Sequence, residues 1–388
     1  MSADVLIVGA GPAGAVAAIV LARAGVRVRL IDRETFPRHK LCGDTLNPGA
    51  LAILRRLGLA ASLEPHALRL DGMIVTGIRG AGVVGAYAPP HCGLSIRRID
   101  LDDQLLREAI RADVVFEDGV TVVGALPPSG GRAPGVRGVR VRLKSGAHAE
   151  LTAPITIAAD GRRSALAFGL GLARHPDKPR RFAIGAYFEG VGGAAFRRKE
   201  LFGEMHVRGS HYIGVAPVPG GLTNVCLVVP QARLHEAAGD GLALLNEMIR
   251  AEPMLADRFA NARIVEGPVV LGPLAVDVTT PGVRGLLLAG DAAGFIDPMT
   301  GDGLRFAIRG GELAAEVACS ALEHGLDGSP ERLASLRRRE FGRKWIFNRG
   351  LRRLAGSRAA IGALSSTADT CGAMLRGMIR FAGDVPAS

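Results

Sequence analysis

The chain has 388 residues, of which 48% are hydrophobic and 22% charged, and this balance is typical of a globular protein rather than a disordered one. Its five cysteines include no Cys-x-x-Cys pair, so the sequence predicts neither a metal site nor a disulfide framework and favours a cytoplasmic location. No apolar run approaches the roughly 20 residues that cross a bilayer. The net charge is +11, but zinc-finger spacing and aromatic-glycine RNA motifs are missing, so nucleic acid is not an expected partner.

The N-terminal third alternates between strand-like and helix-like patterns. Short apolar runs predict buried strands, and longer runs between turn residues predict helices. The first three elements follow the order strand, helix, strand, which is a βαβ unit. In chain order we expect a strand at 5–8, a helix at 13–24, a strand at 27–31, a short helix from Asn47-Pro48 to Gly58, strands at 73–78 and 82–87, and a helix capped by Asp100.

The remaining two thirds predict a sheet followed by helices. Period-2 alternation of apolar residues is typical of antiparallel strands with one buried face. The expected elements are strands and turns over 114–159, sheet strands at 182–188, 212–218 and 223–229, a helix near 240–258, strands near 263–273 and 284–289, and helices at 303–324, about 330–355 and, with a weaker pattern, 358–382.

The first glycine-rich segment has the pattern of a dinucleotide-binding turn. Gly9-x-Gly11-x-x-Gly14 lies between the first strand and the first helix, where glycines allow a tight turn, a close approach to pyrophosphate and close helix–strand packing. Asp32 follows the second strand, where a carboxylate can accept hydrogen bonds from ribose hydroxyls. Strand, helix and acid together make this pattern much more specific than the glycines alone.

The second glycine-rich segment lies near the other end of the chain. A hydrophobic strand ends in Gly290-Asp291, and a turn containing Pro298, Gly301 and Gly303 then opens a long helix. Small residues let the backbone approach a ligand, the acid can hold hydroxyls, and the helix start offers free N–H groups and a positive dipole end. Paired with the first segment, it predicts a bound flavin dinucleotide.

Four motifs in this order resemble those of the para-hydroxybenzoate hydroxylase superfamily of FAD-dependent enzymes. Besides the two segments above, Ala159-Asp160-Gly161-Arg-Arg-Ser164 is similar to a flavin-contact motif, and Arg98-x-x-Leu101-Asp102-x-x-Leu105 to an arginine-bearing helix. The resemblance covers residues 4 to about 315. It implies FAD as the cofactor, with NADPH or NADH as a transient reductant, because a second nucleotide-binding pattern is missing from the sequence.

The resemblance also implies roles for individual residues. Asp32 would bind ribose, Arg98 the phosphates or ribityl chain, and Asp291 the ribityl hydroxyls. Asp160 would organise the turn near the pyrophosphate, and the 301–303 turn would direct its N–H groups at the pyrimidine end of the flavin. The full expected cofactor-binding set is Gly9, Gly11, Pro12, Ala13, Gly14, Asp32, Arg33, Lys40, Cys42, Gly43, Arg98, Asp160, Gly161, Gly290, Asp291, Pro298, Gly301, Asp302, Gly303 and Leu304.

Within the superfamily, the loop Lys40-Leu-Cys42-Gly43 resembles the geranylgeranyl-reductase-like branch, where this loop crosses near the flavin. Cys42 is therefore a candidate catalytic residue, against the alternative that it fills a tight loop. The strand containing Tyr212 is similar to the branch's Tyr-x-Trp-x-x-Pro element, and Tyr212 is the second catalytic candidate. Gly214 stands where that branch often has tryptophan, which predicts a roomier cavity. The Trp-x-Trp-x-Ile-Pro signature of flavin halogenases is missing.

The expected fold is α/β: a doubly wound, Rossmann-like FAD-binding domain with an inserted antiparallel-sheet substrate domain and a helical C-terminus. We assign residues 1–70, 92–180 and 270–325 to the FAD-binding domain and 71–91 and 181–269 to the substrate domain. Residues 326–388 form a basic C-terminal region, with 12 Lys/Arg against 4 Asp/Glu from Glu331 onwards.

Two flavin chemistries fit this sequence. In the first, an NAD(P)H-reduced monooxygenase hydroxylates or epoxidises a hydrophobic small molecule, and the frequency of this reaction in the superfamily places it slightly ahead. In the second, favoured by the Lys-x-Cys-Gly loop, the enzyme reduces a carbon–carbon double bond or introduces one, and reduction needs a proton donor such as Cys42 or Tyr212.

A hypothesis of another class is a peripheral membrane flavoprotein that passes electrons to a quinone or partner. The region 331–358 predicts a basic amphipathic helix, which could bind an anionic membrane surface or an acidic carrier protein. The alternative for this helix is packing on the flavin domain with a solvated basic face.

Overall fold

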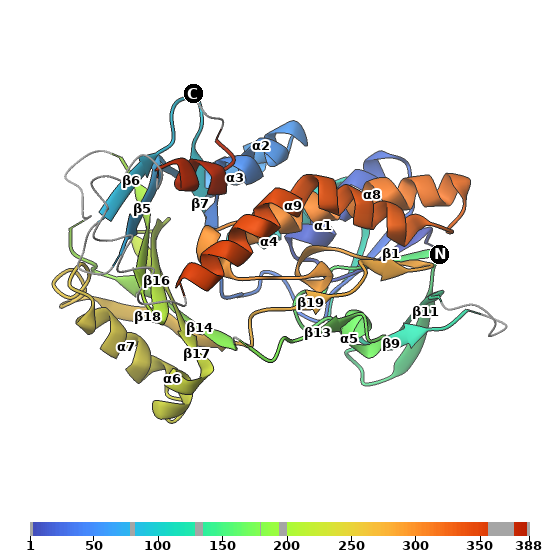
Figure 1. Ribbon diagram of the computed structural model, residues 1–388. Helices are drawn as coiled ribbons and strands as arrows, with labels where there is room; N and C mark the ends of the chain where they lie inside the picture. The colour runs from blue at the N-terminus through green and yellow to red at the C-terminus, as the bar shows by residue number, and fades with distance from the viewer. Residues whose placement is uncertain are drawn as a thin grey trace.

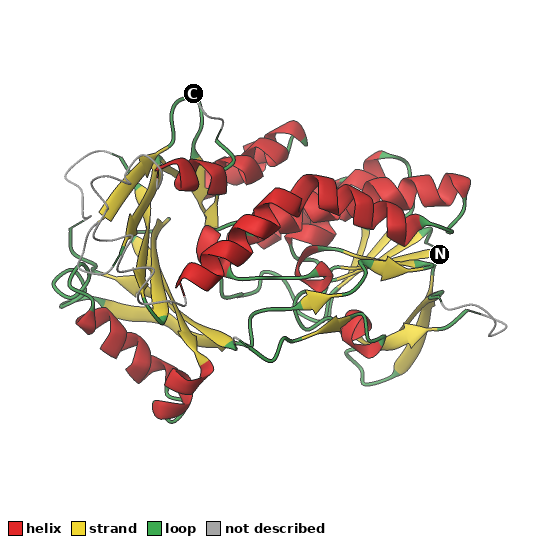
Figure 2. Ribbon diagram, in the orientation of Figure 1, coloured by secondary structure: helices red, strands yellow, loops and turns green. Residues whose placement is uncertain are grey.

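The structure is a computed structural model that describes residues 3–77, 82–128, 135–178, 180–193, 200–355 and 376–385. The chain forms two lobes, one around a mainly parallel sheet near the N-terminus and one around a large, mainly antiparallel sheet (Figure 1). Long helices lie over the first lobe (Figure 2), and the segment 376–385 returns to lie near β6 and β7 (Figure 1). None of the helices in the described ranges is long and apolar enough to span a bilayer.

The first lobe is built on a six-stranded sheet in the order β20-β21-β12-β1-β2-β8. All neighbours in it are parallel except the edge pair β20–β21. The central strands β1 and β12 are buried along their whole length because both faces of the sheet are covered. The strands are β1 (Val5–Val8), β2 (Val28–Ile31), β8 (Val115–Glu117), β12 (Ile155–Ala158), β20 (Gly282–Val283) and β21 (Leu286–Leu288).

Helices cover one face of this sheet, and a small sheet covers the other. Alternate strand residues such as Ile7 and Ile157 pack against the helices, while their neighbours Leu6 and Ala158 pack against β9–β11 and α5. The helices on the first face are α1 (Pro12–Arg23), α2 (Pro48–Arg56), α3 (Ala60–Leu63) with η1 (Glu64–His66), α4 (Arg98–Arg111), α8 (Gly303–His324) and α9 (Ser329–Ala355). The second face is covered by β9 (Thr121–Leu126), β10 (Gly138–Arg142), β11 (His148–Thr152) and α5 (Ala165–Gly169).

The second lobe is a seven-stranded sheet in the order β18-β14-β17-β16-β15-β5-β6. Its pairs are antiparallel except β15–β5. Helices α6 (Gln231–Glu236) and α7 (Gly241–Ala251) bury one face of it. The strands are β5 (Gly72–Thr76), β6 (Gly82–Ala86), β14 (Arg181–Glu189), β15 (Phe202–Arg208), β16 (His211–Val218), β17 (Leu222–Pro230) and β18 (Arg263–Leu271).

Short elements join the lobes. The loop after β2 leads to β3 (Thr45–Leu46), which pairs with β7 (Gly93–Ser95), and β7 also pairs with β4 (Leu68–Leu70). On the other side, β13 (Ala173–Arg174) pairs with β19 (Asp277–Val278). Two 3-10 turns, η3 (Gly290–Ala293) and η4 (Pro298–Thr300), connect β21 to α8.

The fold class expected from the sequence is confirmed, and the differences are local. Asp100 lies in the first turn of α4 and does not cap it, because the helix begins two residues earlier, at Arg98. The helix expected near 240–258 ends at Ala251. Of the weak helix expected at 358–382, residues 376–382 are helical and the part before 376 lies outside the described residues.

The approach of α1 to α8 brings the two glycine-rich segments of the sequence together. An added Cβ on Gly311 of α8 would lie 2.1 Å from the carbonyl oxygen of Ala13, and one on Gly290 would lie 2.9 Å from the Ala13 Cβ. Both helices present small, fully buried residues at this contact. Glycine is therefore required where the second ligand-binding segment meets the first.

We expect Gly311→Ala to destabilise the protein by about 1–3 kcal/mol, because the methyl group overpacks the α1–α8 contact. Gly342→Ala in α9 is the matched control: its added Cβ meets nothing within 4 Å, so it should leave stability unchanged or raise it by about 0.5–1 kcal/mol. Denaturant unfolding measures both. Equal stability of the two variants would contradict the close contact.

Candidate functional site

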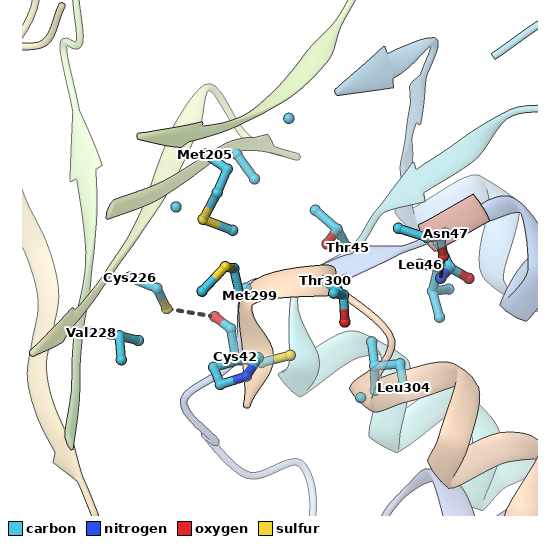
Figure 3. A pocket seen from close by; sticks show the side chains of 18 of the residues that line it. Cys42, Thr45, Leu46, Asn47, Met205, Cys226, Val228, Met299, Thr300 and Leu304 are labelled. Carbon is cyan, nitrogen blue, oxygen red and sulfur yellow. Dashed lines mark hydrogen bonds between the residues drawn. The ribbon is translucent and has the colours of Figure 1, made fainter. Parts of the chain in front are cut away.

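One cavity of about 410 Å³ extends from the carboxyl ends of the parallel strands to the open face of the seven-stranded sheet. It lies where the two lobes meet. Ligands of open α/β sheets bind outside the carboxyl ends of the strands, so the position agrees with a nucleotide site that continues into a substrate site. Figure 3 shows part of its lining, with Met205 of β15 on one side and Thr300 and Leu304, beside the start of α8, on the other.

The residues expected from the sequence divide into two groups in the structure. Members of the first group line the cavity: Gly11, Pro12, Ala13, Lys40, Cys42, Gly43, Arg98, Gly161, Tyr212, Gly290, Asp291, Pro298, Gly301, Gly303 and Leu304. The second group lies behind the lining or away from it: Gly9, Gly14, Asp32, Arg33, Asp160 and Asp302.

Gly9 and Gly14 are needed for packing at the base of the turn. A Cβ on Gly14 would lie 1.8 Å from the Gly9 carbonyl oxygen, and one on Gly9 would lie 2.5 Å from the Ala159 carbonyl oxygen. Gly9 also has a φ of +98°, which L side chains rarely adopt. Gly11 is different, because an added Cβ would lie no closer than 3.5 Å to another residue, at the guanidinium of Arg38, and the position faces the cavity.

Asp32 fixes the backbone at the Gly9–Gly14 turn, and Asp160 fixes the backbone of the neighbouring turn between β12 and α5. Asp32 accepts hydrogen bonds from the backbone N–H groups of Ala10 at 2.7 Å and Glu34 at 2.9 Å. The Asp160 carboxylate accepts one from the Ala165 N–H at 2.9 Å with one oxygen, while its Oδ1 is buried without a partner among the described residues. Burial raises the pKa of Asp160 to about 6.

Arg33 lies outside this region. Its side chain is 68% exposed and pairs with Glu34 at 3.1 Å. The structure therefore gives no contact between Arg33 and the cavity, although it follows Asp32 directly in the sequence.

Cationic side chains converge on the nucleotide half of the cavity. Arg98 donates to both oxygens of Asp102 at 2.8 Å, and Arg38 pairs with the same carboxylate at 3.0 Å. Lys40 lines the cavity beside them, and desolvation together with the two guanidinium groups lowers its pKa. Arg162 also lines the cavity. It belongs to the 159–164 motif but is not in the cofactor-binding set expected from the sequence. Such a group of cations fits a pyrophosphate, which would offset their repulsion.

Asp291 lies at the edge of this cationic group. Burial raises the pKa of its carboxyl group, and the nearby charges of Lys40, Arg98 and Arg162 oppose that rise. It lines the cavity with Gly290 at the end of β21. A carboxylate there can accept hydrogen bonds from ribityl hydroxyls, so cations for the phosphates and an acceptor for hydroxyls make the cavity chemically suited to FAD.

Asp302 has a different place from the one expected. Its carboxylate lies in a buried junction, where it accepts hydrogen bonds from Lys344 Nζ at 2.8 Å, Asn47 Nδ2 at 3.1 Å and Asn348 Nδ2 at 3.5 Å. Lys344 also donates to the carbonyl oxygen of Ala382 at 2.7 Å. The side chain of Asp302 therefore connects the start of α8 to α9 and the end of the chain, while the neighbouring glycines face the cavity.

A second buried carboxyl group, Asp44, lies behind the Cys42 loop. It has a φ of 54°, and it accepts hydrogen bonds from Tyr187 Oη at 2.5 Å, Asn224 Nδ2 at 2.6 Å and the Arg98 N–H at 3.2 Å. Burial raises its pKa to about 6, although these donors favour the ionised form. Asn224 also donates to the Cys42 carbonyl oxygen at 2.9 Å. The cluster fixes the Cys42 loop against the seven-stranded sheet.

The two catalytic candidates differ in how free they are to react. Tyr212 donates its hydroxyl proton to Asp297 Oδ1 at 2.5 Å, and burial raises its pKa well above the usual value, so its hydroxyl is poorly placed to donate to a substrate. Cys42 lines the cavity as a neutral thiol, because burial raises its pKa. Cys226 lies beside it and directs its own thiol to the Cys42 carbonyl oxygen at 3.2 Å (Figure 3).

The substrate half of the cavity is mainly apolar. The sheet contributes Met73, Val75, Met205, Val207 and Val228, and α9 with the C-terminal segment contributes Phe347, Leu351, Met378 and Ile379. Gly214 leaves room here, since an added Cβ would meet nothing closer than the Met205 Cε at 3.7 Å. Space at this position agrees with the roomier cavity that its replacement of tryptophan predicts. Within the described residues, no cluster of His, Cys, Asp or Glu could hold a metal ion.

Comparisons with known proteins identify relatives that span most of the chain. The family described as "FAD binding domain" matches residues 2–325. The chain is 31% identical to menaquinone reductase of Mycobacterium tuberculosis, over 81% of this chain and 76% of that one. It is also 31% identical to digeranylgeranylglycerophospholipid reductase 2 of Methanopyrus kandleri, over 83% of this chain and 78% of that one.

Solved structures of similar fold include both reductase-like proteins and halogenases. A geranylgeranyl bacteriochlorophyll reductase-like protein from Thermoplasma acidophilum has a TM-score of 0.79 at 22% identity, covering 94% of this chain and 91% of that one. The myxobacterial chondrochloren halogenase has a TM-score of 0.83 at 22% identity, covering 97% and 90%. At this identity these similarities show the fold alone.

We expect Asp291→Ala and Gly11→Val to lose bound flavin, because the first removes the acceptor at the end of β21 and the second fills space on the cavity wall. Arg33→Ala should keep its flavin, since Arg33 is exposed and paired with Glu34. The ratio of flavin to protein absorbance in the purified variants measures the effect. A fully yellow Asp291→Ala protein would overturn the assignment.

Asp44 should make stability fall as the pH rises. Its pKa is 3.8 unperturbed and about 6 in the folded protein, so the folded state holds the proton more tightly and this group costs stability above pH 6. Asp44→Asn removes that dependence. Relative to the parent, the variant should gain stability between pH 4 and pH 7 by at most about 3 kcal/mol. Urea unfolding across this range measures it, and parallel pH profiles would show that Asp44 does not titrate as described.

Proposed function

The chain belongs to the family of proteins with this FAD binding domain and is an FAD-dependent oxidoreductase, and from that premise we propose that it reduces a carbon–carbon double bond in an apolar substrate. The observation that carries the proposal is the continuity of the cavity, which joins the nucleotide half to an apolar wall of sheet and C-terminal residues. Relatives named as reductases at 31% identity support the same reaction type. An isoprenoid or another alkenyl lipid is the substrate class that we propose.

Each part of the cavity has a separate task in this reaction. When bound and reduced, FAD supplies a hydride for one alkene carbon. The cations Lys40, Arg98 and Arg162 hold its phosphates, and Asp291 orients its hydroxyl-bearing chain. The apolar wall around Met205 and Val228 aligns the substrate and excludes water.

The second alkene carbon needs a proton, and Cys42 is the candidate donor on the cavity wall. Its thiol is kept protonated by burial, and it is held in place through the Asp44–Asn224 hydrogen bonds. Tyr212 is the poorer candidate, since its proton is already directed to Asp297. We propose NADPH or NADH as the source of the electrons.

Oxygenation is the alternative reaction, and the expectation from the sequence placed it slightly ahead. The structural similarity to halogenases supports the fold alone, and the chain has a single tryptophan, so the Trp-x-Trp-x-Ile-Pro signature is missing. The named relatives with the higher identity are reductases. We therefore place reduction first.

The test is flavin reoxidation without oxygen. The flavin-bound protein is reduced by NADPH or NADH under anaerobic conditions and mixed with a detergent-dispersed menaquinone or a geranylgeranyl ether lipid. Reduction of a double bond predicts that one of these lipids reoxidises the flavin and gains two hydrogens, which mass spectrometry still finds after any quinol formed has been reoxidised to the quinone in air. Reoxidation by oxygen alone, with an oxygen atom found in the product, would instead support the oxygenase.

Gly214→Trp tests the shape of the substrate half. The indole ring would extend from the sheet into the cavity next to Met205, so we expect a raised KM or loss of turnover with a bulky lipid while the flavin content stays normal. Gly220→Ala is a control in the turn after β16, where an added Cβ meets nothing within 4 Å; its positive φ permits some loss of stability but no change in KM. Unchanged kinetics in Gly214→Trp would place the substrate elsewhere.

A further inference from the structure

One side of α9 carries an exposed basic face with an apolar centre. Arg338, Arg339, Arg343 and Arg349 are exposed, and Ile346 is 74% exposed, the most exposed large hydrophobic residue in the described chain. With 100° between successive helical residues, Ile346 lies between Arg338 and Arg349 on one side and Arg339 and Arg343 on the other. Gly342 and Gly350 lie on the same side of the helix, and because they have no side chains they leave Ile346 and the arginines accessible. This set of residues is called the α9 basic face below.

The arginines of this face are close together and lack a carboxylate partner among the described residues. Several exposed arginines elsewhere are neutralised by carboxylates, as Arg27 is by Asp4, Arg55 by Glu64 and Arg107 by Asp103. None of the four α9 basic-face arginines forms an ion pair with another described residue. The nearby Glu340 instead pairs with Arg305 and Arg309 of α8. The face therefore keeps a concentrated positive charge.

The opposite side of the same helix end forms part of the cavity. Phe347 and Leu351 line the apolar substrate half together with Met378 of the C-terminal segment. Phe347 makes an edge-to-face contact with Phe381, which is itself 39% exposed. The α9 helix thus has residues of the apolar cavity wall on one side and the α9 basic face, with exposed Ile346 at its centre, on another. Phe381, which contacts Phe347, is exposed beside them.

We propose that the α9 basic face docks the protein on an anionic lipid surface. Arginine guanidinium groups bind lipid phosphates, and an isoleucine at the centre of a basic face gains free energy by entering the headgroup region. Exposed Ile346 favours a bilayer over a nucleic acid or an acidic protein surface, to which an apolar centre adds little. This docking does not depend on which reaction the flavin carries out.

The expected binding is reversible and sensitive to salt. An arginine near an anionic leaflet contributes roughly a fivefold gain in the binding constant. Four such residues and one inserted isoleucine therefore give peripheral binding that screening by salt weakens.

The test uses the flavin-bound full-length protein and sedimentation with vesicles. We expect binding to vesicles that contain phosphatidylglycerol, little binding to pure phosphatidylcholine, and release at high salt. Arg339→Glu/Arg343→Glu should weaken binding by more than about tenfold, and Ile346→Ser should weaken it at constant charge. Flavin content and unfolding midpoint of each variant are measured alongside, because all three positions are exposed and should leave both unchanged.

The matched control is Lys144→Glu/Arg250→Glu, which changes the net charge equally at exposed positions on other elements. It should keep nearly full binding. Equal loss in the control would show a general charge effect and overturn the docking face. The proposal is also overturned if the parent protein stays in the supernatant with anionic vesicles. That is the result expected if the face binds an acidic protein and not a membrane. Turnover of detergent-dispersed substrate should be unaffected by the α9 variants, which separates this test from that of the reaction.

Discussion

The close crossing of α1 and α8 is the contact on which the site depends. The two helices are far apart in the sequence, and an added Cβ on Gly290 or Gly311 would lie within 2.9 Å of Ala13. This contact places the Gly11 turn beside Asp291, so a single nucleotide can reach both. A residue of ordinary size at this crossing would separate the phosphate-binding end of the cavity from the end near the start of α8.

Buried charges around the cavity are each compensated by a group of opposite charge. Asp102 compensates Arg98 and Arg38, Asp302 compensates Lys344, and Asp297 compensates Arg181. Breaking one partner of such a pair leaves an unpaired buried charge, which is far more costly than replacing both. The loops around the cavity are therefore fixed by specific partners, although most of the cavity wall is apolar.

Local patterns in the sequence were enough to predict the nucleotide half. Gly9, Gly11 and Gly14 are close in sequence, their spacing follows from the geometry of one turn, and the flanking strand and helix are readable from apolar periodicity. The contacts around Asp44 and Asp302 had no such signal. Tyr187 lies 143 residues from Asp44 and Asn47 lies 255 residues from Asp302, so only the folded chain brings them together. Asp302 also shows the limit of a motif, because the pattern marks the turn correctly but does not tell which way one carboxylate points.

The last described residues, 376–385, are held by charged side chains and form part of the cavity wall. Ala382 and Asp384 share Lys344 with Asp302, and Asp384 also pairs with Arg305, while Met378 and Ile379 form part of the cavity wall. The segment 376–385 is thus a component of the cavity wall, and Asp384 connects it by one ion pair to α8 and by another to α9. Whatever displaces this segment, such as a proteolytic cut within it, would therefore change the shape of the cavity at the same time.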